Sequence, residues 1–147
     1  MRLSAIAAAF AAVIFLTGTL MGPGPADASQ PPPPGARAFF ANLKDGDTVK
    51  SPFVVQFGAE GVKVVKAGIT LPGTGHHHLL IDRELTDDDK GFSIPADDNH
   101  LHFGGAQTEV ELSLPPGQYT LQLVFGDGDH VPYDPMLTSE RITITVE

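Results

Sequence analysis

Residues 115–125 read Pro-Pro-Gly-Gln-Tyr-Thr-Leu-Gln-Leu-Val-Phe, a turn sequence followed by a run with an apolar residue at every second position. From Tyr119 to Phe125 the odd-numbered side chains would share one face of an extended chain, because successive side chains of a β-strand point to opposite sides. The same alternation recurs at residues 53–57, 109–114 and 142–146. Glycine and proline separate these runs, so the pattern predicts antiparallel strands joined by short turns, without helices.

The turn at residues 115–121 also resembles the entry to the sixth strand of immunoglobulin-like sandwiches. In those folds a tyrosine two residues before a core position fixes the corner, and Tyr119 stands at that place. The resemblance implies an all-β, antiparallel immunoglobulin-like or fibronectin-like sandwich. We expect its core to contain Phe53, Val55, Phe57, Leu79, Ile81, Leu112, Leu121, Leu123, Ile142 and Ile144.

The first 28 residues have the features of a secretory signal peptide. Arg2 precedes an apolar run at residues 3–20, and Ala26-Asp27-Ala28 is a cleavage site of the Ala-x-Ala type. An uncleaved anchor helix is the alternative, but the run is short for a membrane span and glycines and prolines follow it at once. We therefore expect cleavage before Ser29, a periplasmic or secreted protein, and no stable membrane insertion afterwards.

A proline-rich linker is expected at residues 29–38, which contain four consecutive prolines at 31–34. The folded unit should begin near Arg37, and residues 39–147 should form one β-sandwich domain. The chain has no cysteine, so neither a disulfide nor a lipid-modified cysteine is available to it.

The chain is acidic, with a formal net charge of -9. Binding to nucleic acid requires a surface of lysines and arginines that neutralises phosphates, and no such cluster occurs in the sequence. We therefore expect no nucleic-acid partner.

All six histidines lie in three short polar clusters, at residues 76–78, 100–102 and 130. If the first cluster is extended, His76 and His78 share one face, whereas His77 lies on the other with Leu79 and Ile81. The second pair has the same spacing. The sequence thus predicts a metal site for Cu(II) or Zn(II), which accept imidazole ligands, formed by His76, His78, His100 and His102, with His130 as a possible fifth ligand.

Three aspartates close to these clusters in sequence, Asp82, Asp98 and Asp129, are candidates to orient the histidine rings by accepting hydrogen bonds from them. The alternative is purely structural. His77 would then be a hydrogen-bonded core histidine, and the other rings would bond to backbone carbonyls and polar neighbours.

Several motifs together are similar to those of a bacterial family of small exported domains of unknown function. They are Ser51-Pro52-Phe53, Gly73-Thr74-Gly75-His76-His77-His78-Leu79-Leu80-Ile81-Asp82, His100-x-His102-Phe103-Gly104-x-x-Gln107-Thr108-Glu109, Leu114-x-Pro116-Gly117 and Gly126-Asp127-x-x-His130-x-Pro132. The similarity covers residues 39–147. It implies export and a β-fold but no reaction. Members of this family usually have histidine at the positions of Tyr119 and Tyr133 in this chain, which implies that neither position is an obligatory ligand.

Three classes of function are compatible with these features. The first is a periplasmic metal-binding module that acts as a carrier or sensor. The second is an interaction or structural domain that binds an envelope component without metal. The third, which we favour least, is a metal-dependent β-fold enzyme, either cupin-like through His100, His102 and Glu109 or dismutase-like.

Overall fold

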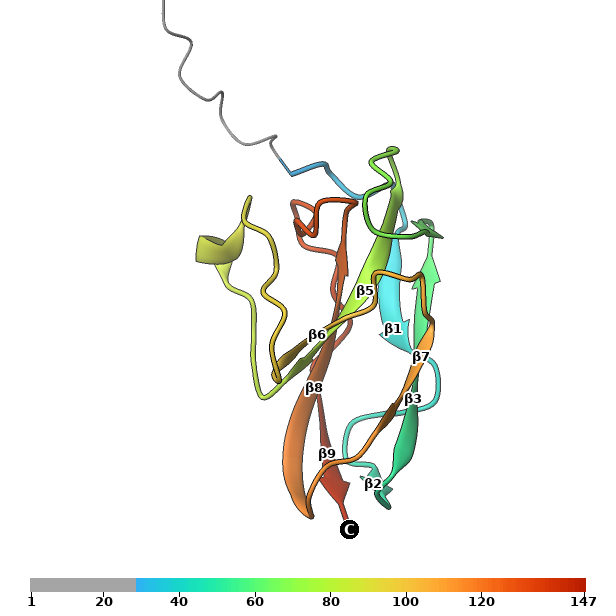
Figure 1. Cartoon of the computed structure of the whole chain (residues 1–147), viewed down its shortest axis with the longest axis vertical. Helices are drawn as coiled ribbons and strands as arrows, with labels where there is room; N and C mark the ends of the chain where they lie inside the picture. Colours follow the sequence, from blue (N-terminus) through green and yellow to red (C-terminus); the bar gives the residue numbers. More distant parts are fainter. Residues whose placement is uncertain (1–28) are drawn as a thin grey trace, which may run out of the picture.

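The computed structural model describes residues 29–147, so the predicted signal peptide lies outside the described residues. Two β-sheets pack face to face (Figure 1). The first sheet has the order β1 (Arg37–Phe40), β3 (Phe53–Glu60), β7 (Glu109–Leu112). The second has the order β2 (Thr48–Val49), β9 (Ile142–Val146), β8 (Gly117–Gly126), β5 (Thr74–Ile81), β4 (Lys63–Val64), and β6 (His100–His102) also pairs with β5.

The topology is that of an immunoglobulin-like sandwich. When β2, β4 and β6 are set aside, six strands remain. β1, β3 and β7, the first, second and fourth of these in chain order, form one sheet. β5, β8 and β9, the third, fifth and sixth, form the other. An immunoglobulin-type sandwich without its D strand has the same division. The predicted fold class is therefore confirmed.

Two short pairings are parallel, although the sequence pattern predicts antiparallel neighbours. β2 runs parallel to β9, and β4 runs parallel to β5. Both β2 and β4 have two residues and add to an edge after the chain has left the first sheet. Such short segments carry too little alternation to be recognised in the sequence.

The corner before β8 is fixed as the tyrosine pattern predicts. The hydroxyl of Tyr119 donates a hydrogen bond of 2.9 Å to the carbonyl oxygen of Pro115, four residues upstream. Tyr119 also packs against the core between the sheets. The bond satisfies a turn carbonyl and fixes the direction in which β8 leaves the turn.

All ten side chains expected in the core are buried, and all ten belong to one cluster between the two sheets. Phe103 and Val146 complete this cluster. The only helical segment among residues 29–147 is the short 3-10 turn η1 (Asp87–Asp89), and no helix in that range is long and apolar enough to cross a membrane.

The proline-rich segment is not a free tether along its whole length. β1 begins at Arg37, and Ala38 is buried, so the first strand starts inside the stretch 29–38 that the sequence analysis assigned to a linker. The carbonyl of Gln30 also accepts a hydrogen bond of 3.0 Å from the backbone N–H of Asp134. The end of the segment lies on the sheet because Ala38 pairs with Ala59 of β3.

Replacing Tyr119 by phenylalanine should lower the free energy of unfolding by about 1 kcal/mol, because the substitution removes one hydrogen bond and leaves the ring in place. Urea denaturation measures this difference. Thr120→Ser is a control in the same strand that keeps its own hydroxyl. An unfolding midpoint of Tyr119→Phe equal to that of the native chain would show that the corner bond contributes nothing.

Candidate metal centre

β5 is the strand that places three consecutive histidines. It pairs with β8 along one edge and with β4 and β6 along the other, so all eight of its residues are buried. Because side chains alternate, His77 points between the sheets, and its two neighbours point to the outer face of the second sheet. The predicted separation of the histidine triplet onto two faces is therefore confirmed.

His77 lies in the apolar core. Its ring centroid is 5.3 Å from that of Phe57 and 5.2 Å from that of Phe125. Neither ring nitrogen has a hydrogen-bond partner among the described residues, so the hydrogen-bonded core histidine considered in the sequence analysis is wrong in this respect. Burial lowers the pKa of His77 to about 4, which keeps the ring neutral near pH 7.

His76 and His78 lie on the outer face, and the register of the neighbouring strands brings a third ring to them. His78 stands opposite His102 of β6, and His76 stands opposite Gly126 at the end of β8. The Nε2 atoms of His76 and His102 are 3.1 Å apart. Two nitrogens bound to one Zn(II) at ~2.05 Å would be ~2.9 Å apart at a right angle and ~3.3 Å apart at the tetrahedral angle.

His130 reaches the same place from the tight turn after β8. Its φ of 69° lies in the left-handed region, which costs a residue with a Cβ roughly 1 kcal/mol. Asp127 holds the turn: its Oδ1 accepts hydrogen bonds of 2.9 Å from the backbone N–H groups of Asp129 and Val131. The carbonyl of His130 also accepts a hydrogen bond of 2.9 Å from the backbone N–H of Ile94.

The four rings form a compact cluster, which we call the four-histidine cluster (His76, His78, His102 and His130). Every pair of its ring centroids is between 4.6 and 6.0 Å apart. One ring nitrogen each of His76, His102 and His130 lies within 4.8 Å of the other two, so small movements of the rings would bring all three onto a single ion.

His100 is not part of this cluster. It stands opposite Leu80, two residues along β5 from the His78–His102 pair, which is ~7 Å in an extended strand. Its Nδ1 is 2.8 Å from Oδ1 of Asp97. The sequence analysis placed His100 among the four main ligands and His130 as a possible fifth. In the structure His130 belongs to the cluster and His100 does not.

The protonation of the cluster favours metal binding. Burial, together with repulsion from the protonated forms of His130, His102 and His77, lowers the pKa of His76 to about 4. Burial and the neighbouring histidines lower the pKa of His78 to about 3, and burial and His130 lower that of His102. These three rings are therefore neutral near pH 7, the form in which imidazole coordinates a metal.

Several ring nitrogens are also free to coordinate. The Nδ1 of His76 and both ring nitrogens of His78 are buried without a hydrogen-bond partner among the described residues. Leaving buried polar atoms unsatisfied costs ~1–3 kcal/mol each, so native proteins usually avoid it. A metal ion bound to one ring nitrogen of His78 would remove part of this cost.

Two glycines give the rings their space. A Cβ at position 126 would lie 2.8 Å from Cε1 of His78, and a Cβ at position 104 would lie 2.6 Å from Nε2 of His102. Gly104 and Gly126 therefore belong to the site, although neither has a side chain that the sequence analysis could recognise as a ligand.

The three aspartates expected to orient the rings are not hydrogen-bonded to any histidine ring. Asp82 Oδ1 accepts hydrogen bonds from the backbone and hydroxyl of Thr120, and neither Asp98 nor Asp129 is hydrogen-bonded to a histidine ring. Those three assignments are wrong. Asp97 is the aspartate that contacts a histidine ring, that of His100 outside the cluster, and Asp127 acts on the His130 turn through backbone N–H groups only.

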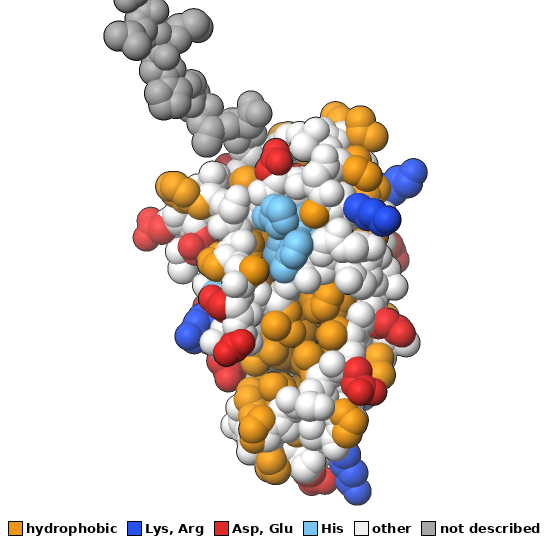
Figure 2. Space-filling view, viewed as in Figure 1, with side chains coloured by type: hydrophobic (Ala, Val, Ile, Leu, Met, Phe, Trp, Pro, Cys, Tyr) orange, Lys and Arg blue, Asp and Glu red, His pale blue; other side chains and the backbone are white. Residues whose placement is uncertain are grey.

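The cluster has a buried floor and an open rim. His76 and His78 are fully buried, whereas His102 is exposed and His130 is half-buried. Figure 2 shows histidine side chains exposed at the surface of the molecule. An ion from solution could therefore reach the cluster without a large rearrangement of the sheet.

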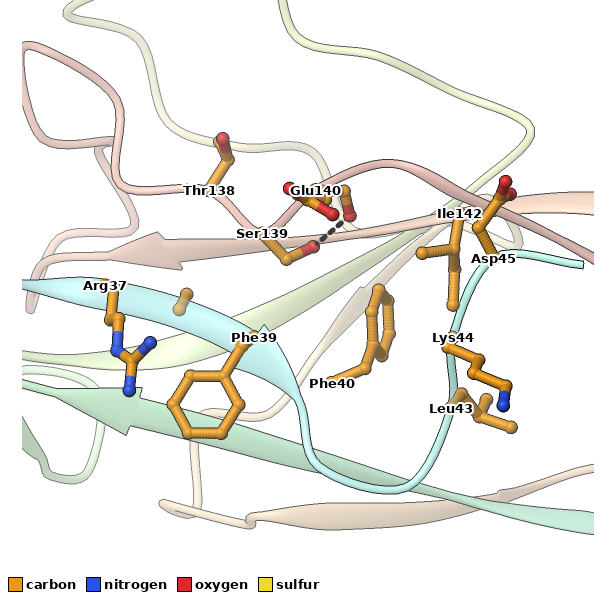
Figure 3. A pocket seen from close by; sticks show the side chains of 11 residues that line it. Arg37, Phe39, Phe40, Leu43, Lys44, Asp45, Thr138, Ser139, Glu140 and Ile142 are labelled. Carbon is orange, nitrogen blue, oxygen red and sulfur yellow. Dashed lines mark hydrogen bonds between the residues drawn. The ribbon is translucent and has the colours of Figure 1, made fainter. Parts of the chain in front are cut away.

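A separate hollow of about 380 Å³ lies between β1 and residues 138–142 (Figure 3). Two of its charged side chains are engaged within the fold: Arg37 pairs with Glu60 and lies over the ring of Phe39, and Asp45 accepts a hydrogen bond from the backbone of Thr143. No histidine lines this hollow.

The family described as a domain of unknown function (DUF4399) matches residues 55–147. The chain belongs to this family. All four histidines of the cluster lie inside the DUF4399 segment, whereas β1 and β2 precede it. No curated protein and no solved structure matches the chain.

Two tyrosines of the DUF4399 segment occupy positions where the sequence comparison expected histidine, and both have structural roles. Tyr119 fixes the corner before β8. Tyr133 is buried beside Phe125, and its hydroxyl donates a hydrogen bond of 2.8 Å to the carbonyl oxygen of Thr74. Neither ring belongs to the four-histidine cluster.

His77→Leu should make the protein less sensitive to acid. An imidazole in the unfolded chain takes up its proton near pH 6.5, but folded His77 does so only near pH 4, so the unfolded state binds more protons between these values. The native chain therefore loses stability as the pH falls through this range, by about 2 kcal/mol at pH 5 from this residue. Leucine has no proton to bind and also removes two unsatisfied nitrogens.

Urea unfolding at pH 8 and pH 5 in EDTA measures this effect. The advantage of His77→Leu over the native chain should grow on acidification. His77→Gln is the control, because glutamine also cannot titrate but still buries polar atoms. This variant should be less stable than His77→Leu at pH 8, and its stability relative to the native chain should rise by the same amount between pH 8 and pH 5. Parallel curves for the native chain and His77→Leu would contradict the expectation.

Proposed function

We propose that this protein is an exported metal-binding module, a carrier or sensor, that holds Cu(II) or Zn(II) in the four-histidine cluster. The observation that carries the proposal is the convergence of four imidazoles from three separate segments, with ring centroids 4.6 to 6.0 Å apart. Apart from the hydrogen bond between His76 and His102, the four rings have no side-chain hydrogen bond or ion pair among residues 29–147, and a shared metal ion would stabilise their proximity.

The ligand chemistry supports these metals. The cluster offers neutral nitrogen donors and no carboxylate, which suits Cu(II) and Zn(II) better than Ca(II) or Mg(II). His76, His102 and His130 have the closest nitrogens, and His78 supplies a fourth ring from the buried floor. The exposed rim at His102 supports a site that exchanges its ion with a carrier or with solution.

Glu109, considered for a cupin-like enzyme, gives no support to a catalytic role. It lies on β7 of the first sheet and accepts a long hydrogen bond of 3.4 Å from the Gln56 side chain. A binding function needs only the histidines and is the function that the geometry supports best.

Single substitutions test the ligand set. His102→Ala should weaken Zn(II) and Cu(II) binding by more than the ~10–100-fold that loss of an outer-shell partner usually costs, because it removes a coordinating nitrogen. His130→Asn should do the same, and asparagine tolerates the left-handed backbone of that position. Competitive titration against a chromophoric chelator measures both affinities with untagged protein.

Two histidine substitutions outside the cluster are matched controls. His100→Ala removes a ring from the same strand as His102, and His77→Leu removes one from the same strand as His76. Both should bind metal as tightly as the native chain does, because neither removes a ring of the four-histidine cluster. Undetectable binding by the native chain, or equal losses in His100→Ala and His102→Ala, would overturn the proposal.

The export part of the proposal rests on the signal-like sequence at residues 1–28. Expression of the full chain in a Gram-negative host should give a periplasmic species that begins at Ser29, as measured by intact mass spectrometry of the fractions. A species that keeps Met1 and sediments with the membranes would exclude this assignment.

A further inference from the structure

Three of the four exposed large apolar side chains among residues 29–147 lie on loops that are bonded to the His130 turn. Ile69 and Leu71 belong to the β4–β5 loop, and their exposed fractions are 39% and 64%. Phe92, after η1, is 69% exposed. A group of apolar side chains on one face of a domain is a feature of interaction surfaces.

Backbone contacts fix both loops to the turn. On one side, the N–H of Gly68 donates a hydrogen bond of 2.8 Å to the carbonyl oxygen of Gly128. On the other side, the Ser93 hydroxyl donates to the carbonyl oxygen of Asp129 at 2.9 Å, and the Ile94 N–H donates to that of His130. The apolar side chains are therefore held on either side of the four-histidine cluster.

The two sides carry opposite charges. The basic flank consists of Lys63, Lys66, Ile69 and Leu71, and the acidic flank consists of Asp87, Asp88, Asp89 and Phe92. In Figure 2 the basic side chains nearest the histidines lie to their right, and acidic side chains lie to their left, although acidic side chains also occur elsewhere on this face. Lys90 lies within the acidic flank, but it is paired with Asp87 and Asp134 at 3.0 and 3.3 Å.

Each flank carries one charged side chain that has no polar partner among the described residues. Neither Lys66 nor Asp88 takes part in an ion pair or a side-chain hydrogen bond within residues 29–147. A surface with opposite charges on its two sides is complementary to itself after rotation by half a turn.

We propose that this face binds a second copy of the same chain in a two-fold symmetric dimer. The basic flank of each copy lies against the acidic flank of the other, and Phe92 of each copy packs against Ile69 and Leu71 of its partner. The axis passes beside the four-histidine cluster, so the rim at His102 and His130 is open to ion exchange in the monomer and is covered in the dimer. The proposal does not depend on metal binding.

The net charge of the chain, -9, opposes association in general. Salt screens charges separated by more than ~8 Å at physiological ionic strength, however, so the facing flanks dominate at contact distance. An aromatic anchor in an apolar contact is also the kind of residue that carries most of the binding energy in protein interfaces.

Charge reversal tests the proposal. Sedimentation velocity of the purified chain in EDTA should show a monomer–dimer equilibrium. Lys66→Glu and Asp88→Lys should each weaken the dimer by at least about tenfold, because each creates two contacts between like charges. An equimolar mixture of the two variants should restore association to within about threefold of the native chain, since the heterodimer contains only opposite charges across its axis.

Lys50→Glu is the control, because Lys50 is exposed and lies beside the C-terminal residues, at the opposite end of β8 from Gly126. It should leave dimerisation unchanged, whereas Phe92→Ala should weaken it by about tenfold. A monomeric native chain at ~0.5 mM, or a mixture that associates no better than either variant alone, would overturn the proposal. EDTA is present throughout, so failure of the metal proposal would leave this test unaffected.

Discussion

The two-sided burial of β5 is the constraint on which the rest of the structure depends. A strand with neighbours along both edges and cover on both faces must place every side chain in a dry environment. Most such strands are nearly continuous runs of valine, leucine and isoleucine. This one carries three consecutive histidines, and the alternation of a β-strand sends them into two different environments.

The buried ring nitrogens have different surroundings in these two environments. His77 takes the place of an apolar residue between two phenylalanine rings, where its nitrogens find no partner and its contribution is that of packing. His76 and His78 have equally buried nitrogens but lie beside two further rings. Only on this second face could a metal ion, as proposed above, take lone pairs and offset the cost of burying these polar atoms.

The open side of the cluster is formed by loops rather than by strands, and this arrangement separates two tasks. The sheet holds the floor rigidly through the pairing of β5 with β8, whereas His130 depends on a turn that Asp127 and Ile94 keep in a left-handed conformation. The same loops carry the exposed apolar and charged residues of the proposed dimer face. Access to the site and contact with a partner are thus governed by the same segments.

The local pattern of the sequence determined the strands, the core, the corner at Tyr119 and the sharing of one face by His76 and His78. These features follow from a period of two and from turn residues, which act over a few neighbours. Which of the other candidate histidines join His76 and His78 in one cluster was decided only by tertiary structure. The register of β6 against β5 sets His102 beside His78 and moves His100 away to Leu80 and Asp97. The Asp127 turn brings His130 in from a point 52 residues further along the chain than His78. Strand register and loop direction depend on contacts between distant segments, so no local pattern could have specified them.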